Sequence, residues 1–250
     1  MPRKTFEIQE LPAIDLDSTY IEGKRYYRTP DGALYPSVTT ILSAMKDQTF
    51  LVEWRKKVGL KEANRISKRA TDRGTEMHQI CEDYLRNKPN YIGRAMPIAV
   101  ELFKNIQPVI DENIEVVYGN ELALFSHTLK TAGRTDVFCR FQGVNTIADF
   151  KTANKDKRED WIQDYFIQST CYAIMIEEMY STEENPIHIP QIAIIIAVED
   201  GEKKSQLFVE KTSAWREKAL STFSRYHELY ELPNPADYPP ETDPKTQANQ

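Results

Sequence analysis

The sequence predicts an α/β fold in which helices pack against a mixed β-sheet. Two observations carry this prediction. Apolar residues recur at helical spacing up to about residue 113, and from residue 114 the period changes to short β-rich runs separated by turn residues. A long helical pattern then precedes the nearly continuous apolar run "IAIIIAV", which is typical of a strand buried on both faces of a sheet.

Residues 1–113 are expected to form a hairpin and a helical region that packs on the sheet. The stretch "YYRTPDGALYPSVTTIL" predicts a hairpin turning at residues 30–32, followed by a helix capped by Ser37 or Thr39. Basic residues then continue into the helical pattern of 69–88. A further helix is expected over 96–113, where Pro97 is tolerated in the first turn.

Residues 114–232 are expected to form the core domain. Three β-rich runs, "IEVVYGNELALF", "TAGRTDVFCRF" and "VNTIADFKTA", predict a meander, and a long helix over 161–180 follows. The apolar strand, a turn, a strand at 205–211 and an amphipathic helix complete the pattern. The remaining stretch, 233–250, is rich in proline and is expected to be an extended or disordered tail.

The composition is that of a globular protein, with 40% hydrophobic and 28% charged residues. No apolar run approaches the roughly 18 residues that a membrane span needs, and the first residues lack the apolar segment of a secretory signal. Cys81, Cys139 and Cys171 never form a CxxC pair, which argues against a zinc ribbon or a disulfide framework. We therefore expect a soluble, cytoplasmic protein without a membrane partner.

Charge is distributed unevenly along the chain. The formal net charge of −6 does not by itself indicate a nucleic-acid-binding protein. Residues 55–73, however, carry eight lysines and arginines against only Glu62 and Asp72. This segment would attract a polyanion locally. The alternative is an ordinary solvated helix face.

The strongest chemical signal is the end of the run "VNTIADFKTA". Alternate side chains of a strand share a face, so Asp149 and Lys151 are expected to point the same way and Phe150 the opposite way. The preceding strand carries Asp136, and antiparallel pairing would bring the two aspartates close together. Such carboxylates repel unless one is protonated or a cation such as Mg²⁺ lies between them. With Lys151 orienting or deprotonating a water, the arrangement suits phosphodiester hydrolysis.

An ordinary salt bridge is the alternative for this pair. The (Asp/Glu)-x-Lys pattern is weak on its own, since the chain repeats it at 22–24, 202–204 and 243–245. Only the copy at 149–151 ends an apolar strand with a second strand-borne aspartate upstream.

Two helical pairs add to the signal. His78 and Glu82 lie four residues apart on one expected helix, and Gln168 and Tyr172 have the same spacing on the helix after the Lys151 strand. A single histidine in a helix more often packs than binds metal, and Tyr172 would equally suit a core position. The carboxylate pair nevertheless favours His78 as a ligand.

Together these motifs resemble the RecB-type branch of the PD-(D/E)XK nuclease superfamily. The matching residues are Gly74-Thr75-x-x-His78, Ala132-Gly133-Arg134-Thr135-Asp136, Asp149-Phe150-Lys151-Thr152 and Gln168-x-x-x-Tyr172. Within that branch, "YPSVTTIL" and "IAIIIAVEDG" resemble the mitochondrial genome maintenance exonucleases and their phage and bacterial relatives. The resemblance covers roughly residues 35–232. Each motif is loose alone, but all four occur in order on the expected elements.

The resemblance implies roles for individual residues. His78, Asp136 and Asp149 would bind a divalent ion together with the main-chain carbonyl of Phe150, and Lys151 would position the attacking water.

The same resemblance implies contacts beyond the metal. Gln168 and Tyr172 would contact the DNA strand near the scissile phosphate. Arg134 would reach a phosphate or brace the aspartate beside it. Glu121 matches a frequent acid of the family and is treated as supporting, as is Glu82.

The implied fold is a restriction-endonuclease-like core, and the implied activity is that of a Mg²⁺- or Mn²⁺-dependent DNA exonuclease. The resemblance implies a preference for single-stranded DNA or frayed ends and a role beside replication or recombination proteins, in a bacterial or phage-infected cell. Relatives with an iron–sulfur cluster carry four cysteines, so none is expected here, and the absence of a Walker A loop argues against a nucleotide cofactor. The alternatives are a duplex-end exonuclease, a structure-specific endonuclease, or a non-catalytic nucleic-acid-binding subunit.

Overall fold

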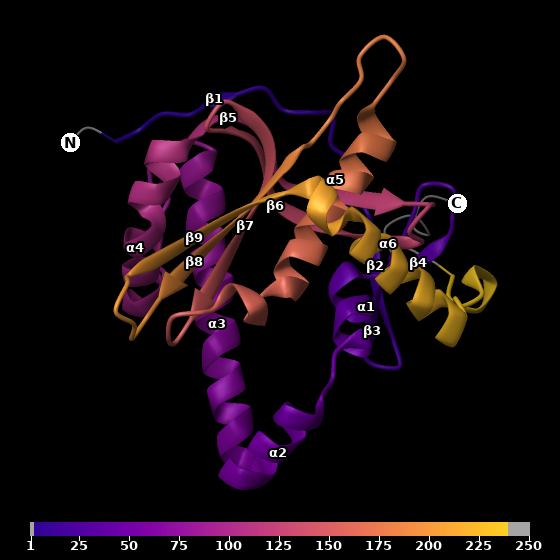
Figure 1. The fold of residues 1–250 in the computed structure, drawn as a ribbon, viewed down its shortest axis with the longest axis horizontal. Coiled ribbons are helices and arrows are strands. Elements are labelled where there is room, and N and C mark those ends of the chain that lie inside the picture. The colour runs from indigo at the N-terminus through magenta and orange to yellow at the C-terminus, as the bar shows by residue number, and fades with distance from the viewer. Residues whose placement is uncertain (1–2, 240–250) are drawn as a thin grey trace, which may run out of the picture.

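The computed structural model of the chain describes residues 3–239. Six strands form one mixed sheet in the order β1-β5-β6-β7-β8-β9 (Figure 1). These strands span Glu7–Ile8, Ile114–Ser126, Thr131–Phe141, Val144–Ala153, Gln191–Val198 and Ser205–Lys211. The pairs β1/β5 and β7/β8 are parallel and the other three are antiparallel. The expected α/β fold with a mixed sheet and flanking helices is confirmed.

A separate antiparallel sheet is formed by the strands β2 (Ser18–Ile21), β3 (Lys24–Arg28) and β4 (Leu34–Pro36). The β3–β4 hairpin turns where the sequence predicts. The side chain of Ser37 then accepts a hydrogen bond from the Thr40 N–H at 3.0 Å and caps the next helix. Of the two caps that the sequence allows, the structure selects Ser37.

Six α-helices complete the described part of the chain. They are α1 (Val38–Met45), α2 (Thr49–Val58), α3 (Leu60–Leu85), α4 (Pro97–Asn113), α5 (Gln163–Tyr180) and α6 (Thr212–Leu229). Gly59 separates α2 from α3 because its φ of 83° is left-handed, a conformation that glycine adopts without steric cost. None of these helices is both long and apolar enough to cross a membrane.

Helices cover both faces of the large sheet. On one face α3 and α4 contribute Met77, Ile80, Leu102 and Phe103 to a core that includes Phe150. On the other face α1, α5 and α6 pack over a second core. The helix α5 connects the parallel strands β7 and β8, and it is buried on nearly all sides between the sheet and α6. The region before residue 114 therefore shares its core with the strands.

One part of the molecule projects from this sandwich. Figure 1 shows α2 and the first half of α3 extending beyond the edge of the sheet. No residue of α2 is buried, and Phe50 at its start is 80% exposed. The basic segment 55–73 lies on these two helices.

The structure adds elements that the sequence pattern did not indicate. The short strands β1 and β2 are one-sided or exposed, so they carry little periodicity. The tail expected to be disordered forms a 3-10 helix over Pro235–Asp237, and the carbonyl of Tyr238 accepts a hydrogen bond from Arg28. A side-chain hydrogen bond from Arg28 joins this segment to the β3–β4 hairpin, and the extended or disordered character expected for 233–239 stays a prediction. The rest of the predicted tail, 240–250, lies outside the described residues.

Candidate metal centre

The site begins where the ladder between β6 and β7 ends. The last paired residues are Val137 and Ala148, and Asp136 and Asp149 come next on their strands. Because no strand carbonyl of β6 takes the Phe150 N–H, it donates instead to Asp136 Oδ2 at 2.7 Å. The two aspartates are therefore neighbours on antiparallel strands, as the sequence predicts. Phe150 contacts the cluster through its amide, while the role of its carbonyl in metal binding stays a prediction.

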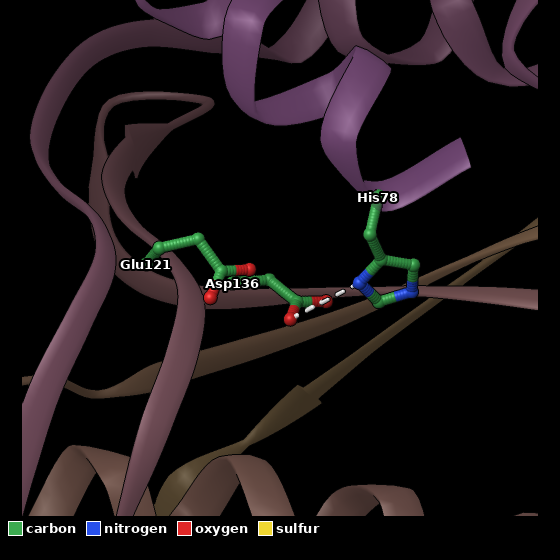
Figure 2. Close-up of side chains that lie close together, drawn as sticks. All are labelled: His78, Glu121 and Asp136. Carbon is green, nitrogen blue, oxygen red and sulfur yellow. Dashed lines mark ion pairs between the residues drawn. The ribbon is translucent and has the colours of Figure 1, made fainter. Parts of the chain in front are cut away.

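His78 approaches Asp136 from α3. Its Nδ1 lies 3.4 Å from Asp136 Oδ1, and Figure 2 shows the imidazole pointing from the helix toward the carboxylate. The ring stands edge-on to Phe150, with centroids 6.4 Å apart. Phe150 thus lies in the core, as predicted, and also supports the histidine. Burial disfavours the imidazolium, but the Asp136 carboxylate outweighs this and raises the pKa of His78.

Glu121 supplies the third group, from β5. Its neighbours Asn120 and Leu122 pair with Val137 and Thr135, so Glu121 lies across from Asp136. Ligand atoms of His78, Glu121 and Asp136 all lie within 4.8 Å of one another (Figure 2). Burial first, and then repulsion by Asp136, raises the pKa of Glu121 to about 7. The residue treated as supporting is thus a member of the cluster.

A left-handed backbone holds Glu121 in this position. Its φ of 53° is uncommon for a residue with a side chain and costs of order 1–2 kcal/mol. Two contacts tie this strained turn to the helix that carries His78. Asn120 Nδ2 donates to the Glu82 carbonyl at 3.0 Å, and Arg86 donates to the Asn120 carbonyl at 3.1 Å.

Sequence reasoning missed Asn120 and Arg86. An asparagine inside a β-rich run was the available signal, because this residue tolerates unusual backbone and hydrogen-bonds to nearby chain. Glu82 pairs with Arg86 at 2.5 Å. It also adds to the rise in the pKa of Glu121, so it lies at the edge of the cluster rather than among the potential ligands.

Asp149 and Lys151 form a buried ion pair beside the cluster. The side chain of Asp149 is 2% exposed and that of Lys151 is 19% exposed. Lys151 Nζ also lies 5.1 Å from the centroid of the Tyr165 ring. Within the described part of the chain, neither carboxylate oxygen of Asp149 has a well-formed hydrogen bond. Burial raises the pKa of Asp149 to about 6, against the opposing effect of Lys151.

The electrostatics of these five groups are coupled. Burial alone would raise the pKa of Asp136, but His78 and Lys151 hold it below its ordinary value. Burial alone would lower the pKa of Lys151, but Asp149 and Asp136 hold it above its ordinary value. The negative charges of the three carboxylates are thus offset partly by the Lys151 ammonium and partly by protons bound at His78 and at the carboxyl groups whose pKa is raised.

A hard divalent cation fits this donor set. Two carboxylates and an imidazole converge, and next to them lies the buried Asp149 carboxylate, whose partner among the described residues is Lys151. Mg²⁺ and Mn²⁺ are bound by one or two carboxylates with waters, and imidazole is a common transition-metal ligand. His78, Glu121 and Asp136 are the residues placed to hold such an ion, and Asp149 is the neighbouring acid.

The residues predicted to contact DNA are placed differently from one another. Tyr172 is 3% exposed, and a Cβ at Gly133 would lie 2.9 Å from its hydroxyl oxygen. Only glycine leaves room for the tyrosine there. Burial raises the pKa of Tyr172, and Gln168, one turn earlier on α5, partly opposes this rise. Tyr172 therefore packs in the core below the carboxylates, and DNA contact by these two residues stays a prediction.

Arg134 lies on the exposed side of β6. It donates to the Glu121 carbonyl at 3.3 Å and pairs with Asp15 at 3.3 Å. Of the two roles that the sequence allows, bracing is the one with contacts in the structure, although the group braced is the turn at Glu121.

Replacing Glu121 by glycine is expected to separate stability from metal binding. Glu121→Gly removes both the left-handed strain and the repulsion with Asp136, so the melting temperature without metal should stay unchanged or rise. The rise in melting temperature on adding Mn²⁺ should shrink, because one ligand is lost. Scanning calorimetry with and without Mn²⁺ measures both. Glu115→Gly, in a register shift near the start of β5 and without a left-handed backbone, is the control, and it should lower stability without changing the Mn²⁺ effect. An unchanged Mn²⁺ effect in Glu121→Gly would remove Glu121 from the centre.

Neither the scan against protein-family models nor the search of curated proteins found a match for this chain.

Proposed function

We propose that the protein is a metal-dependent deoxyribonuclease with a RecB-type PD-(D/E)XK core, acting as an exonuclease on single-stranded DNA or frayed ends. The observation that carries the proposal is the convergence of His78, Glu121 and Asp136 beside the buried Asp149–Lys151 pair. The helix α3 and the consecutive strands β5 and β6 supply these groups. A purely structural salt bridge would explain the Asp149–Lys151 pair but not the three further titratable groups that lie next to it.

The chain's own groups have distinct roles in this proposal. His78, Glu121 and Asp136 hold the divalent ion, which when bound neutralises phosphate charge and lowers the pKa of a water. Lys151, held by Asp149, orients the attacking water. Phe150 fixes Asp136 through its amide and His78 through its ring.

The projecting helices support the preference for a single strand. The helices α2 and α3 carry all eight basic residues of 55–73, and α3 also carries His78 of the site. Trp54, beside Arg55 and Lys56, is partly exposed on α2 and suits stacking against an unpaired base. Proteins of replication or recombination are the expected partners, because such enzymes act on exposed ends.

Digestion of labelled DNA tests the proposal. The protein should degrade an end-labelled single strand in Mg²⁺ or Mn²⁺ and lose this activity in EDTA. A circular single strand should survive, whereas a structure-specific endonuclease would open it. Faster digestion of blunt duplex than of single strands would instead identify a duplex-end exonuclease. Binding of DNA without any EDTA-sensitive cleavage would contradict the proposal and leave a non-catalytic binding subunit.

Metal binding is expected to depend on pH. Protons compete with the ion for Glu121, whose pKa is about 7, and for the neighbouring Asp149, at about 6. Affinity for Mn²⁺ should therefore fall as pH decreases from 8 to 6, and binding near pH 7 should release protons. Because the folded-state pKa of Glu121 lies above its unfolded value, its contribution to stability without metal is present at low pH and is lost as pH rises through about 7.

Titration calorimetry in two buffers of different ionisation enthalpy measures the proton release. Glu121→Gln should release fewer protons than the native chain. An affinity independent of pH between 6 and 8 would exclude these carboxyl groups from the metal site.

A further inference from the structure

A second cationic feature lies on α3, outside the metal centre. Arg65, Arg69 and Arg73 follow one another at intervals of four residues, so they share one face of the helix, and we name them the arginine face. The face lines a cavity of about 340 Å³ together with Asn154 and Lys155, which directly follow β7, and the acids Glu199 and Asp200, which directly follow β8. None of these residues belongs to the metal cluster.

The cavity adjoins the metal centre along two elements. On α3, Arg73 precedes His78 by five residues, which is roughly 7.5 Å along the helix axis. On the sheet side, Lys155 follows the β7 segment that carries Asp149 and Lys151. The helix and β7 approach closely between these points, since a Cβ at Gly74 would lie 3.6 Å from Thr152 Oγ1. From the centre, the arginine face leads along α3 toward the projecting α2 (Figure 1).

The arginine face carries more positive charge than its protein partners neutralise. A single carboxylate, Glu199, pairs with both Arg69 and Arg73. Arg73 is 5% exposed and its Nε has no hydrogen-bond partner in the described part of the chain. Burial, and then repulsion by Arg69, lowers the pKa of Arg73. The site therefore holds two guanidinium groups close enough to repel, with one acid between them.

A structural role accounts for only part of this arrangement. The buried contacts of Arg73 with Glu199 and Asn154 join α3 to the ends of β8 and β7. That role requires neither Arg69 nor Arg65, whose side chains are 61% and 66% exposed. Among the described residues, Arg65 pairs with Glu62 on its own helix and with no other acid, and Lys155 is exposed. Exposed pairs of this kind contribute little to stability.

We propose that the arginine face and Lys155 form a second phosphate-binding site, which holds the DNA strand beside the metal centre on the side toward α2. The inference rests on the proposed function and assigns it a specific strand path. Guanidinium groups spaced by one helical turn present forked N–H donors that match successive phosphates of a flexible single strand. Glu199 pairs with Arg69 and Arg73 in the free protein and is displaced in part when a phosphate binds.

The test uses fluorescence anisotropy with a fluorescein-labelled oligodeoxythymidylate in EDTA, so that binding is measured without cleavage. Arg65→Gln/Arg69→Gln is expected to weaken binding about tenfold at low salt. The dependence of log affinity on log salt should become shallower by about 1.4, or about 0.7 for each lost phosphate contact. Arg140→Gln is the matched control, since Arg140 is a half-exposed arginine paired with one glutamate at the opposite end of β6.

Glu199→Gln provides a change of opposite sign. Removing the carboxylate that pairs with both Arg69 and Arg73 is expected to tighten DNA binding. If these ion pairs had a purely structural role, the variant would be less stable and would bind DNA no more tightly. Equal affinity and salt slope for Arg65→Gln/Arg69→Gln and Arg140→Gln would overturn the inference.

The inference and the proposed function fail in different ways. If the native chain cleaves DNA and the double variant binds it normally, only the second site is wrong. If the native chain neither binds nor cleaves single-stranded DNA, both are wrong.

Discussion

Lys151→Met is expected to reduce DNA cleavage about a thousandfold while leaving DNA affinity nearly unchanged, as befits loss of a group that acts on the attacking water. Methionine keeps most of the volume of the side chain but removes the ammonium that lies against Asp149. Single-turnover cleavage of a labelled single strand in Mg²⁺ measures the rate, and anisotropy in EDTA measures the affinity.

Lys204→Ala is the matched control, because it stands in the same (Asp/Glu)-x-Lys pattern on the exposed β8–β9 turn. It should cleave at the native rate. Lys151→Met also leaves Asp149 buried without its cation, so the stability of this variant should fall near pH 8. Stability should recover at lower pH, where the Asp149 carboxyl is protonated. It should also recover in the double variant Asp149→Asn/Lys151→Met, which has no buried charge at this position. If Lys151→Met cleaved DNA at the native rate, the Asp149–Lys151 pair would be a structural salt bridge without a catalytic role.

Asp136→Asn is expected to abolish both cleavage and the stabilisation by divalent ions. The asparagine oxygen can still accept the Phe150 N–H, so the strand ends should keep their arrangement. Without its negative charge, residue 136 is a poor metal ligand, and it is the central member of the cluster because it contacts His78 and lies across from Glu121. The favourable interactions with His78 and Lys151 that hold the pKa of Asp136 low are lost with its charge, so the metal-free variant should be less stable than the native chain at neutral pH.

The measurements are the melting temperature with and without Mn²⁺ and the cleavage rate. Asp160→Asn, an exposed aspartate paired with Arg158, is the control and should behave like the native chain. If Mn²⁺ raised the melting temperature of Asp136→Asn as much as that of the native chain, the ion would not bind at this cluster. Cleavage that persists without the Mn²⁺ shift would mean that the reaction does not depend on this centre.

Much of the architecture follows from local patterns. The meander β5–β7, the long helix α5, the buried strand β8 and the cap at Ser37 were all readable, because each is a matter of periodicity or of a hydroxyl at a helix start. The neighbouring positions of Asp136 and Asp149 follow equally from a short antiparallel turn. The short strands β1 and β2 escaped because two to four residues carry no reliable period.

The composition of the candidate site shows the limit of such reading. The sequence by itself determined an α/β chain with two aspartates at adjoining strand ends, a lysine on the same face as Asp149, and a histidine in an upstream helix. Only the tertiary structure decided that Glu121 joins His78 and Asp136, that Asn120 and Arg86 tie its turn to α3, and that Tyr172 packs against Gly133. The reason is physical. Periodicity reports which face of an element is buried, whereas a left-handed residue and the approach of a helix to a sheet depend on contacts between segments far apart in the chain.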